Sequence, residues 1–106
     1  MIIDSHCHLE YEPMSLDLKE TISRANNDGV EYLLTISTTD KSLKKILKIT
    51  SNFNCVYGTY GIHPHEAKNH KNIKCEEIIN KIKLSKKIIG IGETGLDFYY
   101  NHSEKK

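Results

Sequence analysis

The segment IIDSHCHL, residues 2–9, starts with two isoleucines and carries, just before its last residue, two histidines separated by one residue. Apolar β-branched residues favour strands, so we interpret it as a short buried strand that becomes polar at its carboxyl end. Successive strand residues point to opposite faces, so His6 and His8 project to the same side and can converge on one cation. An H-x-H pair also occurs as two histidines with ordinary hydrogen bonds, and its place in the fold decides between these interpretations.

The same kind of strand recurs along the chain, each time after a helical pattern. The further expected strands cover residues 30–37, 55–60 and 87–91, and the expected helices cover residues 15–28, a segment from Asp40 onward and residues 73–84. This alternation predicts an α/β fold, with about four parallel strands joined by three right-handed crossover helices. It leaves two architectures open: a small doubly wound sheet, or part of a TIM-type (β/α)8 barrel.

Three residues mark where the expected helices begin and end. Ser15 is a candidate N-cap of the first helix, since its hydroxyl can accept a hydrogen bond from a free backbone N–H. Gly29 supplies the stop of that helix. Asp40 is expected to cap the second helix.

The composition restricts the class of protein. The chain has 106 residues, a formal net charge of +1 and a mean hydropathy of −0.51, so residues 1–106 are expected to form one soluble domain. A charge near zero excludes a protein that coats DNA or membranes through a basic excess, although a nuclease with a local basic patch remains open. Three cysteines without a C-x-x-C pair disfavour a disulfide scaffold and a cysteine-based zinc finger. No apolar stretch approaches the roughly 18 residues of a membrane helix, and the first residues lack signal-peptide features. We therefore expect reduced thiols, no membrane partner and a cytoplasmic location.

Polar side chains also follow two other expected strands. His63-Pro64-His65 follows the strand at residues 55–60, and Glu93 follows the strand at residues 87–91, between Gly92 and Gly95. Taken alone, Glu93 is as well explained by a solvated loop glutamate. Taken together, three of the four expected strands end in histidine or glutamate on the same rim, where α/β folds build active sites. Histidine with carboxylate and no suitably placed cysteine suits zinc, manganese or magnesium.

Three segments carry a resemblance to a known family. DSHCHL at residues 4–9, GIHPH at residues 61–65 and GETGLDFYY at residues 92–100 resemble the signature segments of the TatD family of metal-dependent deoxyribonucleases. The H-x-H element alone is shared with other metal-dependent hydrolases, and the GETGLD segment makes the match specific. The resemblance implies a distorted TIM barrel with its site at the carboxyl ends of the strands. It also implies hydrolysis of phosphodiester bonds, commonly in DNA, with two divalent metal ions.

The resemblance also implies roles for individual residues. His6 and His8 would bind the first metal, and Glu93 would bridge both metals as the central catalytic carboxylate. His63 would face the substrate phosphate. His65 receives no role, and Asp97 and Tyr99 would shape the loop. His70 and His102 are expected to be bystanders.

The length of the chain leads to a second functional hypothesis, in addition to that of an enzyme. A TIM barrel takes about 250 residues, so this chain is expected to be the N-terminal portion of one. Two further histidines and an aspartate that the family places on later strands are missing. Half a barrel would leave two unpaired strand edges and an apolar inner face, so we expect self-association or pairing with a companion half-chain. The alternative to a metal-dependent deoxyribonuclease is therefore a truncated, catalytically incompetent half-barrel that binds metal weakly or pairs with a partner.

Overall fold

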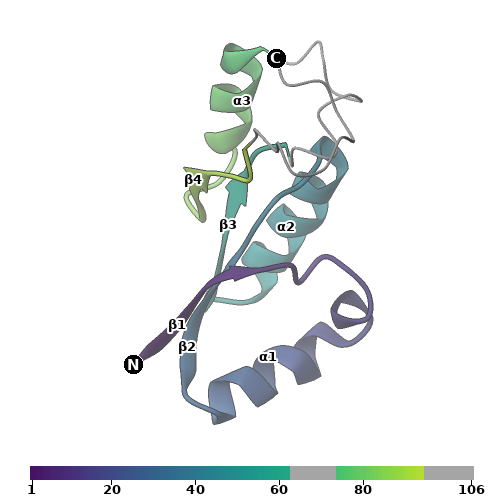
Figure 1. Cartoon of the computed structure of the whole chain (residues 1–106), viewed down its shortest axis with the longest axis vertical. Helices are drawn as coiled ribbons and strands as arrows, with labels where there is room; N and C mark the ends of the chain where they lie inside the picture. The colour runs from purple at the N-terminus through teal and green to yellow at the C-terminus, as the bar shows by residue number, and fades with distance from the viewer. Residues whose placement is uncertain (63–73, 95–106) are drawn as a thin grey trace, which may run out of the picture.

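The computed structural model describes residues 1–62 and 74–94, which form one sheet with helices between its strands (Figure 1). In chain order the elements are β1 (Ile2–Cys7), the short 3-10 helix η1 (Met14–Asp17), α1 (Leu18–Asn27), β2 (Val30–Thr35), α2 (Asp40–Asn52), β3 (Val56–Tyr60), α3 (Cys75–Ile82) and β4 (Ile88–Ile91). The predicted order of strands and helices is confirmed, with boundaries that differ by a few residues.

The order of the strands decides between the two architectures. Each strand pairs in parallel with the next one along the chain, giving the order β1-β2-β3-β4. A doubly wound sheet reverses its strand order at a switch point, and this sheet does not. Right-handed crossovers between sequential parallel strands place every helix on the same face, as in a barrel. The fold is therefore part of a (β/α) barrel.

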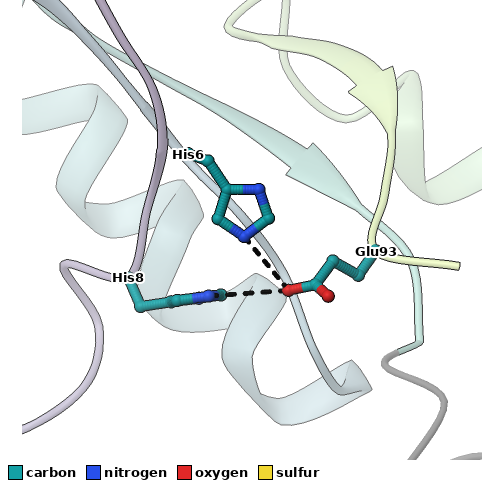
Figure 2. A group of neighbouring side chains, drawn as sticks. All are labelled: His6, His8 and Glu93. Atoms are coloured by element: carbon teal, nitrogen blue, oxygen red, sulfur yellow. Dashed lines mark ion pairs between the residues drawn. The ribbon is translucent and has the colours of Figure 1, made fainter. Parts of the chain in front are cut away.

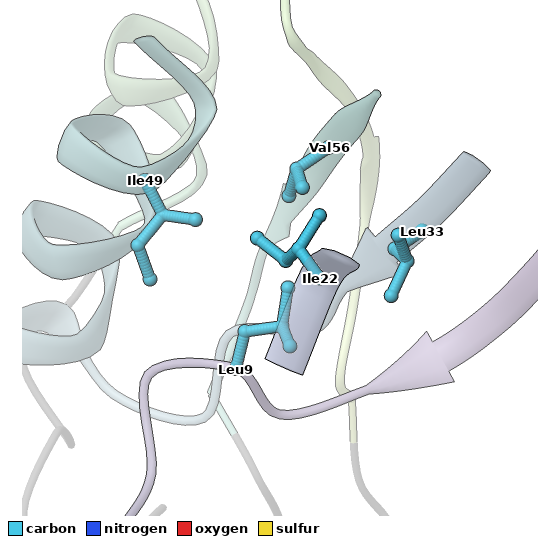
Figure 3. Close-up of a cluster of buried hydrophobic side chains, with 5 residues drawn as sticks. All are labelled: Leu9, Ile22, Leu33, Ile49 and Val56. Carbon is cyan, nitrogen blue, oxygen red and sulfur yellow. The ribbon is translucent and has the colours of Figure 1, made fainter. Parts of the chain in front are cut away.

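The hydrophobic core lies between the sheet and its helices. One cluster joins β1, β2 and β3 to α1 and α2, and consists of Leu9, Ile22, Leu33, Ile49 and Val56 (Figure 3). A second cluster continues it toward α3 and β4, and consists of Leu43, Ile46, Tyr60 and Ile88. Helix α2 contributes to both clusters, so it connects the two halves of the core. Full burial of such a side chain contributes about 1.5–3 kcal/mol.

The starts of the first two helices differ from the sequence predictions, whereas the end of α1 agrees. Helix α2 is capped by Thr39, whose hydroxyl oxygen accepts a hydrogen bond from the Ser42 backbone N–H at 3.1 Å. The Ser42 hydroxyl accepts in return from the Thr39 backbone N–H at 3.0 Å, which completes a capping box. Asp40 is thus the first helical residue, and its prediction as the cap is wrong. The prediction that Ser15 caps the first helix is wrong as well, because Ser15 lies inside η1. Gly29 ends α1 as predicted, with a φ of 95° that favours glycine.

The Asp40 carboxylate is used to connect elements. It accepts a hydrogen bond from the Tyr60 hydroxyl of β3 at 3.0 Å, and it forms an ion pair with Lys81 of α3. The contact with Lys81 lowers the pKa of Asp40. Burial of the Tyr60 side chain is the main cause that raises its pKa, and the hydrogen bond to Asp40 raises this pKa further. These contacts tie α2 and α3 to the strand between them.

Within residues 1–62 and 74–94, no helix combines the length and apolar character needed to cross a membrane.

Candidate metal centre

The candidate site draws its side chains from opposite edges of the sheet. His6 belongs to β1, His8 follows it directly, and Glu93 comes two residues after β4. A flat four-stranded sheet would hold its edge strands roughly 14 Å apart, at about 4.8 Å for each neighbouring pair. Contact between these side chains therefore reflects both their reach and a strongly curved sheet, as barrel closure requires.

The three side chains meet at one carboxylate oxygen (Figure 2). The Oε2 atom of Glu93 lies 3.3 Å from Nε2 of His6 and 3.5 Å from Nε2 of His8. One ligand atom from each of the three residues lies within 4.8 Å of the ligand atoms of the other two. Two ligands of one ion, each bound at about 2.1 Å, lie roughly 3.0–3.4 Å apart in octahedral or tetrahedral geometry. The two distances from Glu93 are close to this spacing, so two imidazoles and a carboxylate can bind one divalent cation after small shifts of the side chains.

The cluster is open to solvent on one side. The side chain of His6 is 56% exposed, whereas those of His8 and Glu93 are 26% and 25% exposed. The side chains of His8 and Glu93 are thus largely covered by the protein, and that of His6 lies at the solvent-exposed side of the site. Such an arrangement lets an ion reach the three side chains without opening the core.

The other ring nitrogen of His8 is held by groups beneath the site. Its Nδ1 lies 3.0 Å from the backbone carbonyl oxygen of Ile36 and 3.4 Å from Oε1 of Glu10. A carbonyl oxygen can only accept, so Nδ1 carries the hydrogen and Nε2 of the neutral ring keeps its lone pair. The lone pair is directed at the place where Glu93 and His6 meet. This is the support that metal-binding histidines generally receive.

Glu10 is a buried carboxylate that the sequence analysis missed. Its second oxygen accepts a hydrogen bond from the Thr35 hydroxyl at 2.8 Å, and its side chain is inaccessible to solvent. The Thr35 hydroxyl in turn accepts from the Leu9 backbone N–H at 3.1 Å. The only sequence signal was a charged residue directly after the apolar Leu9. Glu10 thus links the ring of His8 to β2 through a chain of hydrogen bonds.

Tyr11 fixes the ring of His8 from the side. The two rings are stacked, with centroids 5.1 Å apart and planes inclined by 14°. The Tyr11 hydroxyl is hydrogen-bonded to the Thr38 hydroxyl. The tyrosine is therefore anchored at its far end, and it limits rotation of the His8 ring.

Backbone contacts hold Glu93 in place. Its backbone N–H donates to the Ser37 carbonyl oxygen at 2.9 Å. The residue before it, Gly92, is held by the Tyr60 carbonyl oxygen and the Thr59 hydroxyl. A Cβ atom on Gly61 would lie 2.4 Å from the carbonyl oxygen of Glu93, a separation that real Cβ atoms do not adopt. Glycine at position 61 therefore permits the close approach of the β3 and β4 loops.

Cys7 lies between the two histidines in sequence but is not available to the site. Its thiol lies 3.4 Å from the Leu34 carbonyl oxygen, on the side of the core. Burial, and to a lesser extent Asp4 and Glu10, raises the pKa of Cys7 to about 12. The thiol is therefore neutral at physiological pH and a poor metal ligand. All three cysteines are free, as expected.

The structure brings together three of the four predicted site residues, namely His6, His8 and Glu93. His63, predicted to face the substrate phosphate, lies outside the described residues. Five other residues on which the sequence analysis commented also lie there: His65, His70, Asp97, Tyr99 and His102.

Comparison with known proteins places this geometry in a family. Residues 3–106 match the family described as TatD related DNase. An uncharacterized metal-dependent hydrolase of Buchnera aphidicola subsp. Baizongia pistaciae is 36% identical over 110 residues, covering 99% of this chain and 40% of the relative. The deoxyribonuclease Tat-D of Schizosaccharomyces pombe is 32% identical over 91 residues, covering 77% of this chain and 29% of the relative.

The fold is similar to that of a solved relative. The crystal structure of YjjV, a TatD homolog from Escherichia coli, superimposes with a TM-score of 0.75 at 24% identity. The match covers 94% of this chain and 39% of YjjV. The chain thus spans about two fifths of the length of such relatives. With the family match running over nearly all of its residues, the chain belongs to the TatD-related DNase family of metal-dependent hydrolases.

Proposed function

We propose that the chain holds a divalent cation between His6, His8 and Glu93, and that this centre hydrolyses phosphodiester bonds of DNA. The observation that carries the proposal is the convergence of three ligand atoms, from opposite edges of the sheet, within 4.8 Å of one another. DNA as the substrate is supported by family membership and by the deoxyribonuclease name of the fission-yeast relative.

The donor set bears on the identity of the ion. Imidazole nitrogen suits zinc and other transition metals, whereas magnesium prefers oxygen ligands and keeps several waters. Two imidazoles and one carboxylate therefore favour Mn²⁺ or Zn²⁺ over Mg²⁺. The family resemblance implies two ions at a complete site, and Glu93 would be a ligand that both of them share.

Each residue of the centre has a defined task in this proposal. A divalent ion, when bound, supplies hydroxide near neutral pH by lowering the pKa of a coordinated water. His8 presents the lone pair of its Nε2, because the Ile36 carbonyl keeps its proton on Nδ1, and His6 would supply the second imidazole ligand. Glu93 supplies negative charge at the rim from a position fixed by the Ser37 carbonyl. His63 would orient the substrate phosphate.

The proposal is tested by hydrolysis of single-stranded DNA by the purified chain in the presence of Mn²⁺. Glu93→Gln removes the charge shared by the two histidines and is expected to abolish hydrolysis. Glu20→Gln, which neutralises an exposed carboxylate paired with Arg24, is the matched control and should retain activity. Equal hydrolysis by the Glu93→Gln variant would contradict the assignment.

A second candidate function is a half-barrel that binds metal without catalysis. It is favoured by one observation: the part of the chain that the structure describes offers three ligands, and the chain spans about two fifths of its relatives. Binding of Mn²⁺ that depends on Glu93, without hydrolysis in a folded sample, would support this candidate over the nuclease.

A further inference from the structure

The peptide unit that joins Gly92 to Glu93 is hydrogen-bonded at both of its polar atoms. Its carbonyl oxygen, which belongs to Gly92, accepts a hydrogen bond from the Thr59 hydroxyl at 2.9 Å. Its N–H, which belongs to Glu93, donates to the Ser37 carbonyl oxygen at 2.9 Å. A peptide unit is planar, so these two contacts together set the orientation of the plane from which the Glu93 side chain departs.

The hydroxyl of Thr59 has a defined direction in this arrangement. The Ser37 backbone N–H can only donate, and it lies 3.4 Å from Oγ1 of Thr59, which therefore accepts. The hydrogen of the same hydroxyl is directed at the Gly92 carbonyl oxygen, which can only accept. Both Ser37 and Thr59 are buried, so a group that lost its partner here would not be compensated by bulk water.

Thr59 holds this segment through its side chain, whereas its neighbours hold it through the backbone. The regular pairing of β3 with β4 ends at Tyr60 and Ile91, one residue before Gly92. The Gly92 N–H donates to the Tyr60 carbonyl oxygen at 3.0 Å, and the next N–H donates to the Ser37 carbonyl oxygen. Any residue at positions 37 and 60 would supply these carbonyl oxygens. The hydroxyl at position 59 is a contact that depends on the amino-acid type.

We infer that Thr59 is a positioning residue, which aligns Glu93 for metal binding through the carbonyl of Gly92. The inference rests on the proposed function, because it concerns the same metal centre. The Oε2 atom of Glu93 lies 3.3 Å and 3.5 Å from the Nε2 atoms of His6 and His8. Groups that bind a metal must be held within about 0.5 Å of their working positions, so a shift of the peptide plane by a larger amount moves the carboxylate out of reach.

The inference is tested by titrating variants of the full chain with Mn²⁺, followed by electron paramagnetic resonance. Thr59→Val keeps the shape of the side chain but removes the hydroxyl, and should raise the dissociation constant about tenfold or more. Thr59→Ser keeps the hydroxyl and should restore most of the affinity. Thr50→Val is the matched control, because Thr50 is also buried and its hydroxyl donates to the Leu47 carbonyl oxygen within α2. It loses a hydrogen bond of the same kind and should leave the affinity unchanged.

A second measurement reads the position of Glu93 without metal. With EDTA present, hydrogen exchange of the Glu93 amide, followed by nuclear magnetic resonance, should be about tenfold or more faster in Thr59→Val than in Thr50→Val. Both variants lose one buried hydrogen bond, so a general loss of stability accelerates exchange in both, and the difference between them reports the local hold on Glu93. Circular dichroism checks that each variant is folded, and Thr59→Ala replaces Thr59→Val if the latter unfolds.

The outcomes separate this inference from the proposed function. Equal Mn²⁺ affinity in Thr59→Val and Thr50→Val would overturn the inference and leave the metal centre standing. A loss of affinity that Thr59→Ser does not restore would overturn it as well. If the unchanged chain does not bind Mn²⁺, the proposed function fails, and the exchange of the Glu93 amide decides on Thr59: faster exchange in Thr59→Val supports its hold on Glu93, and equal exchange in the two valine variants overturns it.

Discussion

Two neighbouring isoleucines of β4 experience opposite environments. Ile88 is 5% exposed and packs beneath α2 and α3, whereas Ile89 is 60% exposed on the inner face. The same residue type in the same strand therefore stabilises the fold on one face and is left open on the other. The difference shows that stability resides mainly on the helix-covered face. The inner face contributes little to this packing, because side chains such as Ile89 remain exposed there.

The largest expected effect comes from breaking the covered face. Ile46→Ala removes a fully buried side chain from the cluster that joins α2, β3 and β4. We expect it to lower the free energy of unfolding by about 2–5 kcal/mol, measured by urea denaturation. Leu84→Ala, at an exposed leucine, should change it by less than about 0.5 kcal/mol. Equal losses in the two variants would show that the helix-covered face is not the source of stability.

A smaller effect is expected where the covered face meets the rim. Gly61→Ala forces a Cβ against the carbonyl oxygen of Glu93, and should cost about 1–3 kcal/mol and weaken Mn²⁺ binding about tenfold or more. Gly90→Ala is the matched control, because its Cβ would meet only the Thr59 methyl at 3.7 Å. Both quantities are measured, by urea denaturation and by titration with Mn²⁺. Unchanged Mn²⁺ affinity in the Gly61→Ala variant would show that this glycine has no role in positioning Glu93 for metal binding.

The support beneath His8 gives the next test. Glu10→Ala leaves Thr35 without its acceptor and the His8 ring without a buried neighbour, so Mn²⁺ affinity should fall about 10–100-fold. Glu10→Gln keeps an acceptor oxygen at the same place and should restore most of the affinity. If both variants bind Mn²⁺ as the unchanged chain does, then Glu10 has no part in orienting His8.

The smallest expected effect comes from the partly exposed ion pair between Asp40 of α2 and Lys81 of α3. The pKa of Asp40 is lowered by Lys81, so the folded state favours the charged carboxylate. This stability is present above the unfolded pKa of about 3.9 and is lost as the pH falls through the folded value. Because both side chains are about a third exposed, Asp40→Asn should cost only about 0.2–1 kcal/mol at pH 6. Urea denaturation should show this cost shrinking as the pH is lowered to about 2; a cost that grows would contradict the ion pair.

The sequence predicted the architecture because the pattern of apolar and polar residues is local. Strand and helix order followed from periodicity, and the meeting of His6, His8 and Glu93 followed from their positions at strand ends. Helix starts were less predictable, since Thr39 and Ser42 form their capping box while Asp40 turns to Lys81 and Tyr60, a tertiary contact.

The parts of the site that the sequence did not predict depend on three-dimensional curvature. The pairing of β1 with β2 is irregular between Asp4 and Cys7, and the Cys7 thiol lies on the side of the core. Glu10 and Gly61 matter only because the edge loops approach each other closely. The role of His63 at the substrate phosphate stays a prediction.

The most direct test of the account is a titration of the chain with Mn²⁺, followed by electron paramagnetic resonance. We predict saturable binding that weakens at least tenfold in His6→Ala and Glu93→Gln and is unchanged in Glu20→Gln, which alters a carboxylate far from the rim in α1. Equal affinity in all four proteins would contradict the central claim that two histidines and one glutamate at this rim hold the metal.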